Sequence, residues 1–408
     1  MVTLALIRDA AALLEGKIIR TPLVYSPTFS EMTGGQVYLK LEGMQKAGSF
    51  KVRGAASRIL ADLSRIGKNG VIAASAGNHA QGVAVAAGIA GVPVTIVMPE
   101  WASPSKQEAA AGYGATIILK GGTLEESIAH AMDLAASADL TFIHPYNDEA
   151  VIAGQGTIGL EIVEDLPDVD VVIVPVGGGG LIAGITTAVK ELRPGSRIIG
   201  VQAAACPSAR RALQSGEPVT ITALPTIADG IRVTRIGDLA FPVLRDRVDE
   251  VVEVDDTAIV HAMYALLERK KVLAEGAGAA PLAALLSGKV RIPAGERVVA
   301  VISGGNVDAF LFERILRKGL FDAGRILACR IELEEGAQPL PVLLSLIAEE
   351  GGTIVRIEQE RGSPDLPLHL IRAVLEVETR GPDHRDRILA ALHAAGYHVR
   401  MFFPAGHR

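Results

Sequence analysis

Residues 170–185 read Asp170-Val171-Val172-Ile173-Val174-Pro175-Val176-Gly177-Gly178-Gly179-Gly180-Leu181-Ile182-Ala183-Gly184-Ile185. The apolar run before the glycines is typical of a strand buried in a parallel sheet, and the apolar run after them is typical of a packed helix. Four glycines at this junction leave the backbone amides at the start of the helix open to an anion. The stretch therefore predicts a phosphate-binding loop in an α/β fold.

Apolar runs alternate with helical patterns through the first 310 residues. This alternation predicts parallel sheets with helices on both faces, and ligands are expected where the strands end. Strands are expected at 70–74, 94–98, 116–119, 171–176, 198–202 and 298–303. Helices are expected at 79–90, 104–111, 123–136 and 257–268. The first twenty residues carry too many charges for a signal peptide, so a short amphipathic helix is expected there.

The pattern changes after Gly319. Prolines open an expected helix that Gly351 and Gly352 close. Strands are expected at 325–333, 353–359, 368–378 and 397–403, with helices at 339–350 and 383–395. The last part of the chain is thus expected to form a separate βαββαβ domain.

Composition and charge narrow the function classes. Of the 408 residues 49% are apolar and 4% aromatic, which suits sheets filled by aliphatic side chains. The net charge of -6 gives no reason to expect a nucleic-acid partner. The basic residues near position 50 are expected to be solvated surface charges, apart from Lys51. They are Lys40, Lys46, Lys51, Arg53 and Arg58.

The expected location is the cytoplasm. Cys206 and Cys329 lie far apart and show no metal-ligand spacing, which is typical of a reducing compartment. The uncharged stretches 82–99 and 171–189 are interrupted by glycine and proline, so no membrane span and no membrane partner are expected.

A second stretch, Ser49-Phe50-Lys51-Val52-Arg53-Gly54-Ala55, supplies an amine. A lysine amine can hold an aldehyde cofactor as a Schiff base, and the glycine loop can hold a phosphate on the same cofactor. Pyridoxal phosphate carries both groups. Neither stretch is sufficient alone, because most lysines are solvated and many glycine runs are linkers.

Two further polar stretches follow expected strands. They are Ser75-Ala76-Gly77-Asn78-His79-Ala80-Gln81-Gly82, which opens a helix, and Ser303-Gly304-Gly305-Asn306. The exposed amides of the first stretch, with the side chains of Ser75, Asn78 and His79, can bind a carboxylate. The hydroxyl of Ser303 can meet a ring nitrogen.

This ordered set of motifs resembles the threonine dehydratases among the fold-type II pyridoxal-phosphate enzymes. The resemblance spans essentially the whole chain and includes residues 21–23, 40–42, 153–157, 228–230 and 274–278. It implies two open, mostly parallel sheet domains, of which residues 1–46 and 147–320 form the large domain that binds pyridoxal 5'-phosphate, and residues 47–146 the small one. Residues 325–408 resemble an ACT regulatory domain.

The resemblance also implies roles for single residues. Lys51 is the Schiff-base lysine and, once released, the base that removes the Cα proton. Phe50 packs near the cofactor ring, Asn78 donates to its phenolic oxygen, and Ser303 faces its pyridine nitrogen. The phosphate is held by Gly177, Gly178, Gly179, Gly180 and Leu181. The substrate is held by Ser75, Ala76, Gly77, Asn78, His79 and Glu275. For His79 and Glu275 a plain packing or turn role is equally open.

The implied reaction removes water from L-threonine, and from L-serine, to give a 2-oxo acid and ammonia. The implied assembly is a homodimer or homotetramer with isoleucine or valine as effector. The effector is expected at the loop Glu334-Glu335-Gly336-Ala337-Gln338, although the C-terminal domain is alternatively only a dimerisation unit. No metal is expected, because Gln202 stands where the eukaryotic serine racemases have a metal-binding carboxylate.

Other functions were weighed on the same residues. Residues 178–183 fit a dinucleotide motif, but Gln202 and Ala203 end the next strand where that fold needs an acid. No P-loop motif occurs. A serine racemase is closer, but Ala76 stands where racemases have the second acid/base serine. A β-replacement enzyme has different asparagine and phosphate loops, and an amino-acid sensor with decayed catalysis would not keep Lys51 and Ser303 intact.

Overall fold

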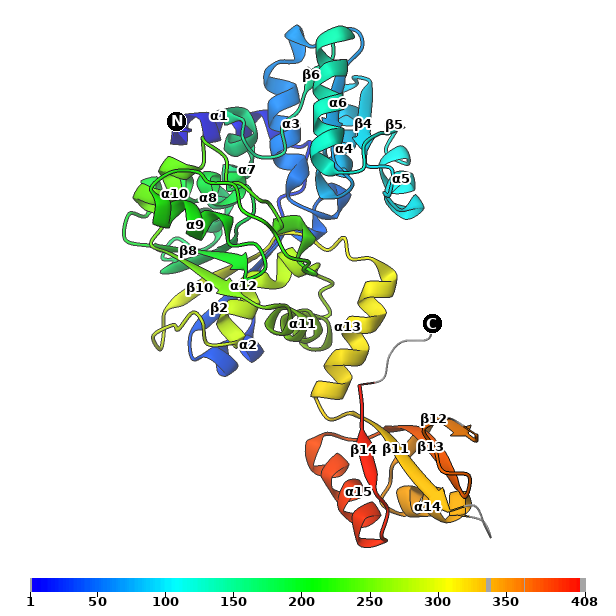
Figure 1. Ribbon diagram of the computed structural model, residues 1–408. Coiled ribbons are helices and arrows are strands. Elements are labelled where there is room, and N and C mark those ends of the chain that lie inside the picture. The colour runs from blue at the N-terminus through cyan, green and yellow to red at the C-terminus, as the bar shows by residue number, and fades with distance from the viewer. Residues whose placement is uncertain (1, 335–338, 363, 404–408) are drawn as a thin grey trace. The chain divides into compact units, whose positions relative to one another are not determined.

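A computed structural model of the protein describes residues 2–334, 339–362 and 364–403. The larger of two units, Met1–Val307, is built around a sheet that includes β2, β8 and β10 (Figure 1). The full strand order is β1-β2-β10-β7-β8-β9. All neighbouring strands pair in parallel except β1 and β2. The strands are β1 (Leu23–Tyr25), β2 (Gln36–Leu41), β7 (Val171–Pro175), β8 (Arg197–Ala203), β9 (Glu250–Val254) and β10 (Arg297–Ile302).

The strand order explains why distant motifs meet. Strand β10 lies between β2 and β7, and all three run in the same direction. The residues that follow them therefore leave the sheet at one edge, which is where α/β proteins bind ligands. These residues are 42–51 after β2, 177–180 after β7 and 303–306 after β10.

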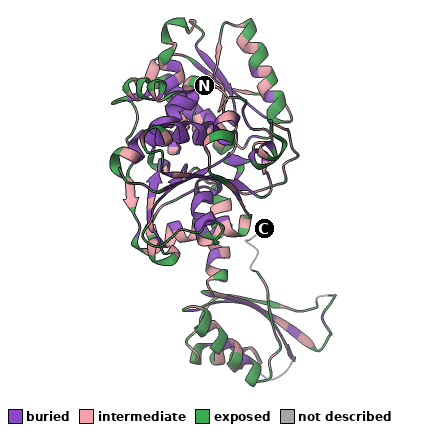
Figure 2. Ribbon diagram, turned by 90° about the vertical axis from the view of Figure 1, so that its left-hand side faces the viewer, coloured by how far each residue is buried: buried purple, intermediate pink, exposed green. Residues whose placement is uncertain are grey.

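Helices cover both faces of this sheet. On one face, α7 and α8 share a core with Val172, Val174 and Val301. Ile173 and Ala300, which point to the opposite face, are also fully buried. The strands of this sheet are accordingly coloured mostly as buried in Figure 2. Helix α12 packs against the same strands. The helices of this part are α1 (Leu4–Leu14), α2 (Pro27–Thr33), α7 (Glu149–Asp165), α8 (Gly180–Leu192), α9 (Ser208–Ser215), α10 (Phe241–Arg247), α11 (Asp256–Ala265) and α12 (Gly276–Leu286).

A second sheet of the same unit has the order β5-β4-β3-β6, with every pair parallel. Helices α3 and α4 pack on each other and share a core with its strands. A Cβ at Gly82 of α4 would lie 2.9 Å from the Cβ of Lys51, so the two helices touch closely at this point. The elements are α3 (Lys51–Ala61), β3 (Val71–Ala74), α4 (Asn78–Ala90), β4 (Val94–Met98), α5 (Pro104–Ala111), β5 (Thr116–Leu119), α6 (Leu124–Ser137) and β6 (Thr141–Phe142).

The smaller unit, Asp308–Arg408, carries an antiparallel sheet in the order β12-β13-β11-β14. Leu343, Ile347, Ile388 and Leu392 of its helices pack on the inward residues of the strands. The elements are α13 (Ala309–Asp322), β11 (Ile326–Glu334), α14 (Pro339–Glu349), β12 (Thr353–Glu360), β13 (Leu370–Glu378), α15 (Pro382–Ala394) and β14 (Val399–Met401). The predicted βαββαβ order is thus confirmed. Of the loop predicted for the effector, residues 335–338 lie outside the described residues.

The boundary between the units differs from the one expected. The sequence placed residues up to 320 in the large domain, whereas α13 groups with the C-terminal sheet. Two contacts join α13 to the C-terminal sheet. Arg317 Nη1 donates to Glu376 Oε2 of β13 at 2.9 Å, and the ring centres of Phe321 and Phe403 lie 5.7 Å apart. No helix of the described ranges is long and apolar enough to cross a membrane.

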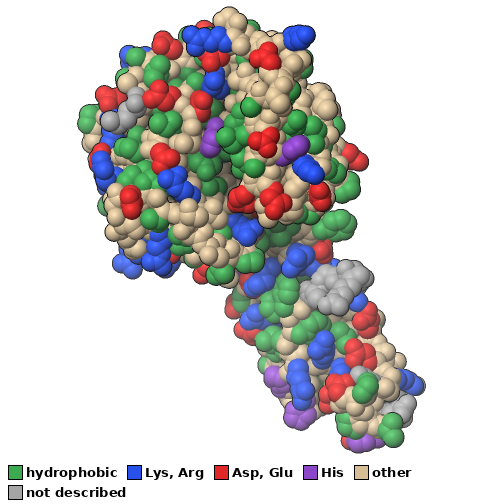
Figure 3. Space-filling model, turned by 45° about the horizontal axis from the view of Figure 1, so that its top comes forward, with side chains coloured by type: hydrophobic (Ala, Val, Ile, Leu, Met, Phe, Trp, Pro, Cys, Tyr) green, Lys and Arg blue, Asp and Glu red, His purple; other side chains and the backbone are tan. Residues whose placement is uncertain are grey.

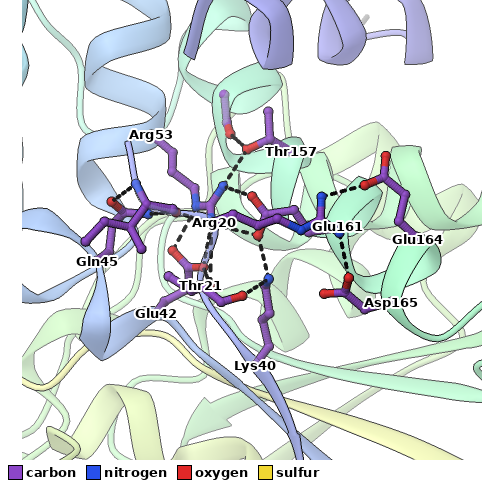
Figure 4. Close-up of polar contacts among 12 residues, drawn as sticks. Arg20, Thr21, Lys40, Glu42, Gln45, Arg53, Thr157, Glu161, Glu164 and Asp165 are labelled. Atoms are coloured by element: carbon purple, nitrogen blue, oxygen red, sulfur yellow. Dashed lines mark hydrogen bonds and ion pairs between the residues drawn. The ribbon is translucent and has the colours of Figure 1, made fainter. Parts of the chain in front are cut away.

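Lys40 and Arg53 were predicted to be solvated surface charges, and for these two residues the prediction is wrong. Both side chains are 0% exposed, so they add nothing to the mixed acidic and basic surface in Figure 3. Arg53 binds Glu42 through two nitrogens at 2.8 Å each and Glu161 at 2.6 Å (Figure 4). Lys40 binds Glu161 at 2.5 Å and the Thr21 carbonyl at 2.7 Å.

This buried ion network is electrically balanced. Two cations, Lys40 and Arg53, face two carboxylates, Glu42 and Glu161. Burial alone would lower the pKa of Arg53, but Glu42 and Glu161 outweigh burial and raise it. The network joins β2, α3 and α7, and it thereby ties the helix that begins with Lys51 to the large sheet.

Removing one charge from the network should destabilise the fold strongly. Glu161→Gln leaves two buried cations against one carboxylate, so we expect a loss of about 3–5 kcal/mol in the free energy of unfolding. Glu164→Gln is the matched control, because Glu164 lies on the same helix and pairs with Arg20 while its side chain is 58% exposed. The control should lose less than about 1 kcal/mol. Urea denaturation of both variants measures the difference, and equal losses would contradict the account.

Candidate active site

Lys51 is the first residue of α3 and lies at the carboxyl edge of the large sheet. The turn before it contains Gly48, whose φ is 68°. The Phe50 amide donates to the Ser303 carbonyl at 3.1 Å, and the Gly305 amide donates to the Gly48 carbonyl at 2.9 Å. These two bonds fix Lys51 beside the end of β10.

The Lys51 amine is partly buried and has few polar contacts. Its Nζ donates to the Pro145 carbonyl at 3.0 Å and lies 5.2 Å from the centre of the Phe50 ring. Burial lowers the pKa of Lys51 to about 8, and the nearby Glu275 carboxylate opposes that shift. An amine with such a pKa is partly uncharged near neutral pH, so it can act as nucleophile or base.

The four glycines form a loop that tolerates no side chains. A Cβ at Gly178 would overlap the ring of Tyr146, and one at Gly179 would lie 2.7 Å from Ala240. Gly179 also has a φ of 91°, which other residues rarely adopt. Helix α8 begins directly after this turn, at Gly180.

The amides of residues 177–181 have no hydrogen-bond acceptor within the described part of the chain. They stand at the end of β7 and at the N-terminus of α8, where the helix dipole adds positive potential. Such a group of unpaired amides favours a bound anion. The loop is therefore suited to an anion, and phosphate binding by residues 177–181 stays a prediction.

Asn78 is held from both sides. Its Nδ2 donates to Glu275 Oε1 at 2.6 Å, and its Oδ1 accepts from Asn306 Nδ2 at 2.9 Å. Glu275 is 5% exposed, and burial raises its pKa to about 8. The charge of Asp229 adds to this shift, while the hydrogen bond from Asn78 and the charge of Lys51 oppose it.

Ser75 and His79, the other polar side chains of this turn, form hydrogen bonds with the protein backbone. Ser75 Oγ accepts from the Gly77 amide at 3.1 Å. His79 is buried and its Nε2 bonds to the Ile143 carbonyl at 2.9 Å. Burial and the charge of Lys51 lower the pKa of His79 to about 3, although the bond to the carbonyl opposes them, so the ring is neutral. Direct substrate contacts of Ser75 and His79 stay predictions.

Two serines flank the turn that carries Lys51. Ser49 is fully buried and its hydroxyl has no hydrogen-bond partner among the described residues. Ser303 follows β10 and is 2% exposed. A buried hydroxyl is costly unless it is paired, so the Ser49 hydroxyl is an exception that a polar group bound at this site would resolve.

A segment that the sequence analysis did not single out also lies here. His144 Nδ1 accepts from the amides of Tyr146 and Asn147 at 3.2 and 2.8 Å, so its proton is on Nε2. Burial and Lys51 lower the pKa of His144 to about 4, against the effect of Asp148. The sequence offers only one sign of this segment, a polar and aromatic run after β6. The apolar pattern did not predict β6, because it has only two residues.

Comparison with known families settles the class of this site. Residues 14–304 match the family described as Pyridoxal-phosphate dependent enzyme. The chain belongs to this family. Its cofactor is therefore pyridoxal 5'-phosphate.

Individual relatives resemble the chain over most of its length. The L-threonine ammonia-lyase of Thermotoga maritima is 45% identical over 401 residues, which are 98% of this chain and 100% of that protein. Among solved structures, maize serine racemase has a TM-score of 0.74 and 38% identity, covering 79% of this chain and 98% of its own. Threonine deaminase isoform 2 of Solanum lycopersicum has a TM-score of 0.72 and 34% identity, covering 77% and 92%.

The residues present fit this cofactor. Lys51 supplies an amine with a lowered pKa, the loop 177–181 supplies unpaired amides at a helix N-terminus, and Ser49 is a buried hydroxyl without a partner. A side chain at any of the four glycines would meet a neighbouring residue. The amine suits the aldehyde of the cofactor, and the unpaired amides suit its phosphate.

The raised pKa of Glu275 predicts a pH dependence of stability in the cofactor-free protein. Its pKa rises from 4.5 in the unfolded chain to about 8, so the folded protein binds a proton that the unfolded chain releases between these values. The free energy of unfolding therefore falls as the pH rises from 4.5 to 8. The titration of Lys51 affects the free energy of unfolding only above about pH 8, because its pKa falls from 10.5 to about 8 on folding.

The variant Glu275→Gln tests this prediction. The variant should lack this pH dependence. Its free energy of unfolding should therefore rise relative to that of the original protein by a few kcal/mol between pH 5 and pH 8, on the order expected for such a pKa shift. Thermal unfolding at several pH values measures this. Parallel curves for the two proteins would show that Glu275 is ionised throughout.

Proposed function

We propose that this protein is a threonine ammonia-lyase, which converts L-threonine into 2-oxobutyrate and ammonia and accepts L-serine as a second substrate. The main support is the Lys51 amine, which follows β2 at the sheet edge where Ser303 and the glycine loop also lie, and whose pKa is lowered by burial. The full-length similarity to the Thermotoga maritima enzyme favours this reaction among those of the family.

We assign the cofactor contacts as the sequence predicts. Lys51 would bind the aldehyde, the loop Gly177–Leu181 the phosphate and Ser303 the pyridine nitrogen, with Phe50 against the ring. The remaining N–H of Asn78 would donate to the phenolic oxygen. When bound, pyridoxal phosphate withdraws electrons from the substrate and makes its Cα proton acidic.

Once the amino group of the substrate has replaced it on the aldehyde, Lys51 is a free amine and acts as the base. Its Nζ takes the proton from Cα, which requires the amine to be uncharged, and the lowered pKa makes this form available near neutral pH. The β-hydroxyl takes up a proton and leaves as water, and the resulting enamine is hydrolysed, through its imine form, to the 2-oxo acid and ammonia. Lys51 stays close to the reacting carbon because α3 is anchored by the Arg53 network.

The substrate carboxylate is assigned to the turn formed by residues 75–79. Gly77 precedes α4, so the amides of this turn stand at a helix N-terminus and favour an anion. His79 would act on the substrate indirectly, because its bond to Ile143 holds the turn in place. Glu275 would act on the substrate indirectly, because it accepts a hydrogen bond from Asn78, which is assigned to the cofactor.

A serine racemase is the second candidate, because a solved racemase shares this fold at 38% identity. Racemisation needs an acid on the face of Cα opposite to Lys51. The residue before Gly77 is Ala76, whose methyl group carries no proton. This residue favours elimination over racemisation.

The smaller unit is proposed to regulate activity. Its strand order and helices suit an amino-acid-binding ACT-like domain, with isoleucine or valine as effector. The full-length match to the Thermotoga maritima enzyme includes this region. A homodimer or homotetramer in the cytoplasm is part of the same proposal.

The reaction is tested with L-threonine and the cofactor-loaded protein. We expect 2-oxobutyrate and ammonia in equal amounts, and Lys51→Ala should lower kcat by ~10³-fold because the base is lost. Lys46→Ala is the matched control. Lys46 lies five positions earlier in the sequence, its Nζ bonds to the Lys17 carbonyl on the surface, and its loss should leave the rate unchanged.

Two results would contradict the proposal. Formation of D-serine from L-serine without pyruvate would favour the racemase. Equal rates of 2-oxobutyrate formation with Lys51→Ala and Lys46→Ala would remove Lys51 from the reaction.

A further inference from the structure

Asn306 contacts two segments of the site at once. Its Nδ2 donates to the Ala47 carbonyl at 2.7 Å and to Asn78 Oδ1 at 2.9 Å. Ala47 belongs to the turn before Lys51, and Asn78 begins α4. One side chain after β10 therefore joins the Lys51 turn to the asparagine that is assigned to the cofactor.

The directions of these bonds are fixed by chemistry. The carbonyl of Ala47 can only accept, so the atom of Asn306 that faces it must be the nitrogen. The second proton of this nitrogen points to Asn78, which must present its oxygen. The nitrogen of Asn78 then faces Glu275, which accepts at 2.6 Å. One N–H of Asn78 remains for another acceptor.

The surroundings hold Asn306 in this position. A Cβ at Gly48 would overlap the amide of Asn306, so the side chain lies directly on the backbone of the turn. The Glu275 amide donates to the Gly304 carbonyl at 3.1 Å. Three hydrogen bonds, from Asn306 to Asn78, from Asn78 to Glu275 and from the Glu275 amide to Gly304, thus form a ring that the chain from Gly304 to Asn306 closes.

We propose that Asn306 is a positioning residue that fixes the amide of Asn78 and so directs its remaining N–H toward the bound cofactor. The proposal rests on the assignment of Asn78 to the phenolic oxygen of pyridoxal phosphate. A hydrogen bond to that oxygen withdraws charge from it and lowers the proton affinity of the nitrogen contributed by Lys51. Loosening Asn78 raises that affinity.

The experiment compares Asn306→Ala, Asn306→Leu and Asn69→Ala as cofactor-loaded proteins. The absorbance of the bound cofactor is titrated with pH, and kcat and KM are measured for L-threonine. Asn306→Ala should shift the midpoint of the titration upward by at least ~0.5 pH unit and lower kcat by about tenfold with a smaller change in KM. Asn69→Ala is the matched control. Its Nδ2 also donates to a carbonyl, that of Ala138 at 2.7 Å, but this bond does not involve Asn78 or the turn before Lys51, and the variant should titrate like the original protein.

Asn306→Leu separates positioning from packing, because leucine has a similar shape but neither an N–H to donate nor a charge. If Asn306 positions Asn78, the leucine variant should shift the titration at least as far as the alanine variant. A titration of Asn306→Leu like that of the original protein would overturn the proposal, also if the alanine variant does not fold. A shifted titration in a protein that does not convert L-threonine would leave this inference standing and overturn the proposed function.

Discussion

Arg53 is the side chain on which the geometry of the site depends. It lies between Glu42, which follows β2, and Glu161 of α7, and its side chain is completely buried. Two positive and two negative charges in this network cancel, which makes their burial tolerable only while all four are present. Because Arg53 stands two residues after Lys51 on α3, the same contacts fix the helix that carries the reactive amine.

The order of the strands then completes the site. With β10 between β2 and β7, the turn before Lys51, the segment Ser303–Asn306 and the glycine loop leave the sheet side by side. Hydrogen bonds between the turn and residues 303–305 lock this arrangement. Asn78 comes from the other sheet of the same unit, so the site lies where the two sheets meet.

Local patterns in the sequence predicted much of this architecture. The glycine run and the apolar runs at 94–98 and 116–119 carry their structure in their own residues, and β4 and β5 have the same bounds as expected. The short strands β6 and β9 were missed, and so was the edge of the large sheet formed by β1 and β2. Lys51, Gly177–Gly180 and Ser303 stand out because their motifs are local.

Contacts between distant residues could not be read in the same way. The partners of Arg53 lie 11 and 108 positions away, so nothing near position 53 distinguishes a buried arginine from a solvated one. Likewise, Asn306 bonds to Asn78 across 228 positions. The packing of α3 on α7 brings Arg53 to Glu161, and the pairing of β10 with β2 brings Asn306 to the turn before Lys51. Both arrangements are properties of the whole fold.

The central claim is that the Lys51 nitrogen carries the cofactor. Reduction of the resting, cofactor-loaded protein with borohydride, followed by proteolysis and mass spectrometry, tests this directly, because reduction makes the bond between amine and aldehyde permanent. The account predicts a single pyridoxyl-labelled peptide, modified at Lys51. A label at Lys40, at Lys106 or at no lysine would contradict it.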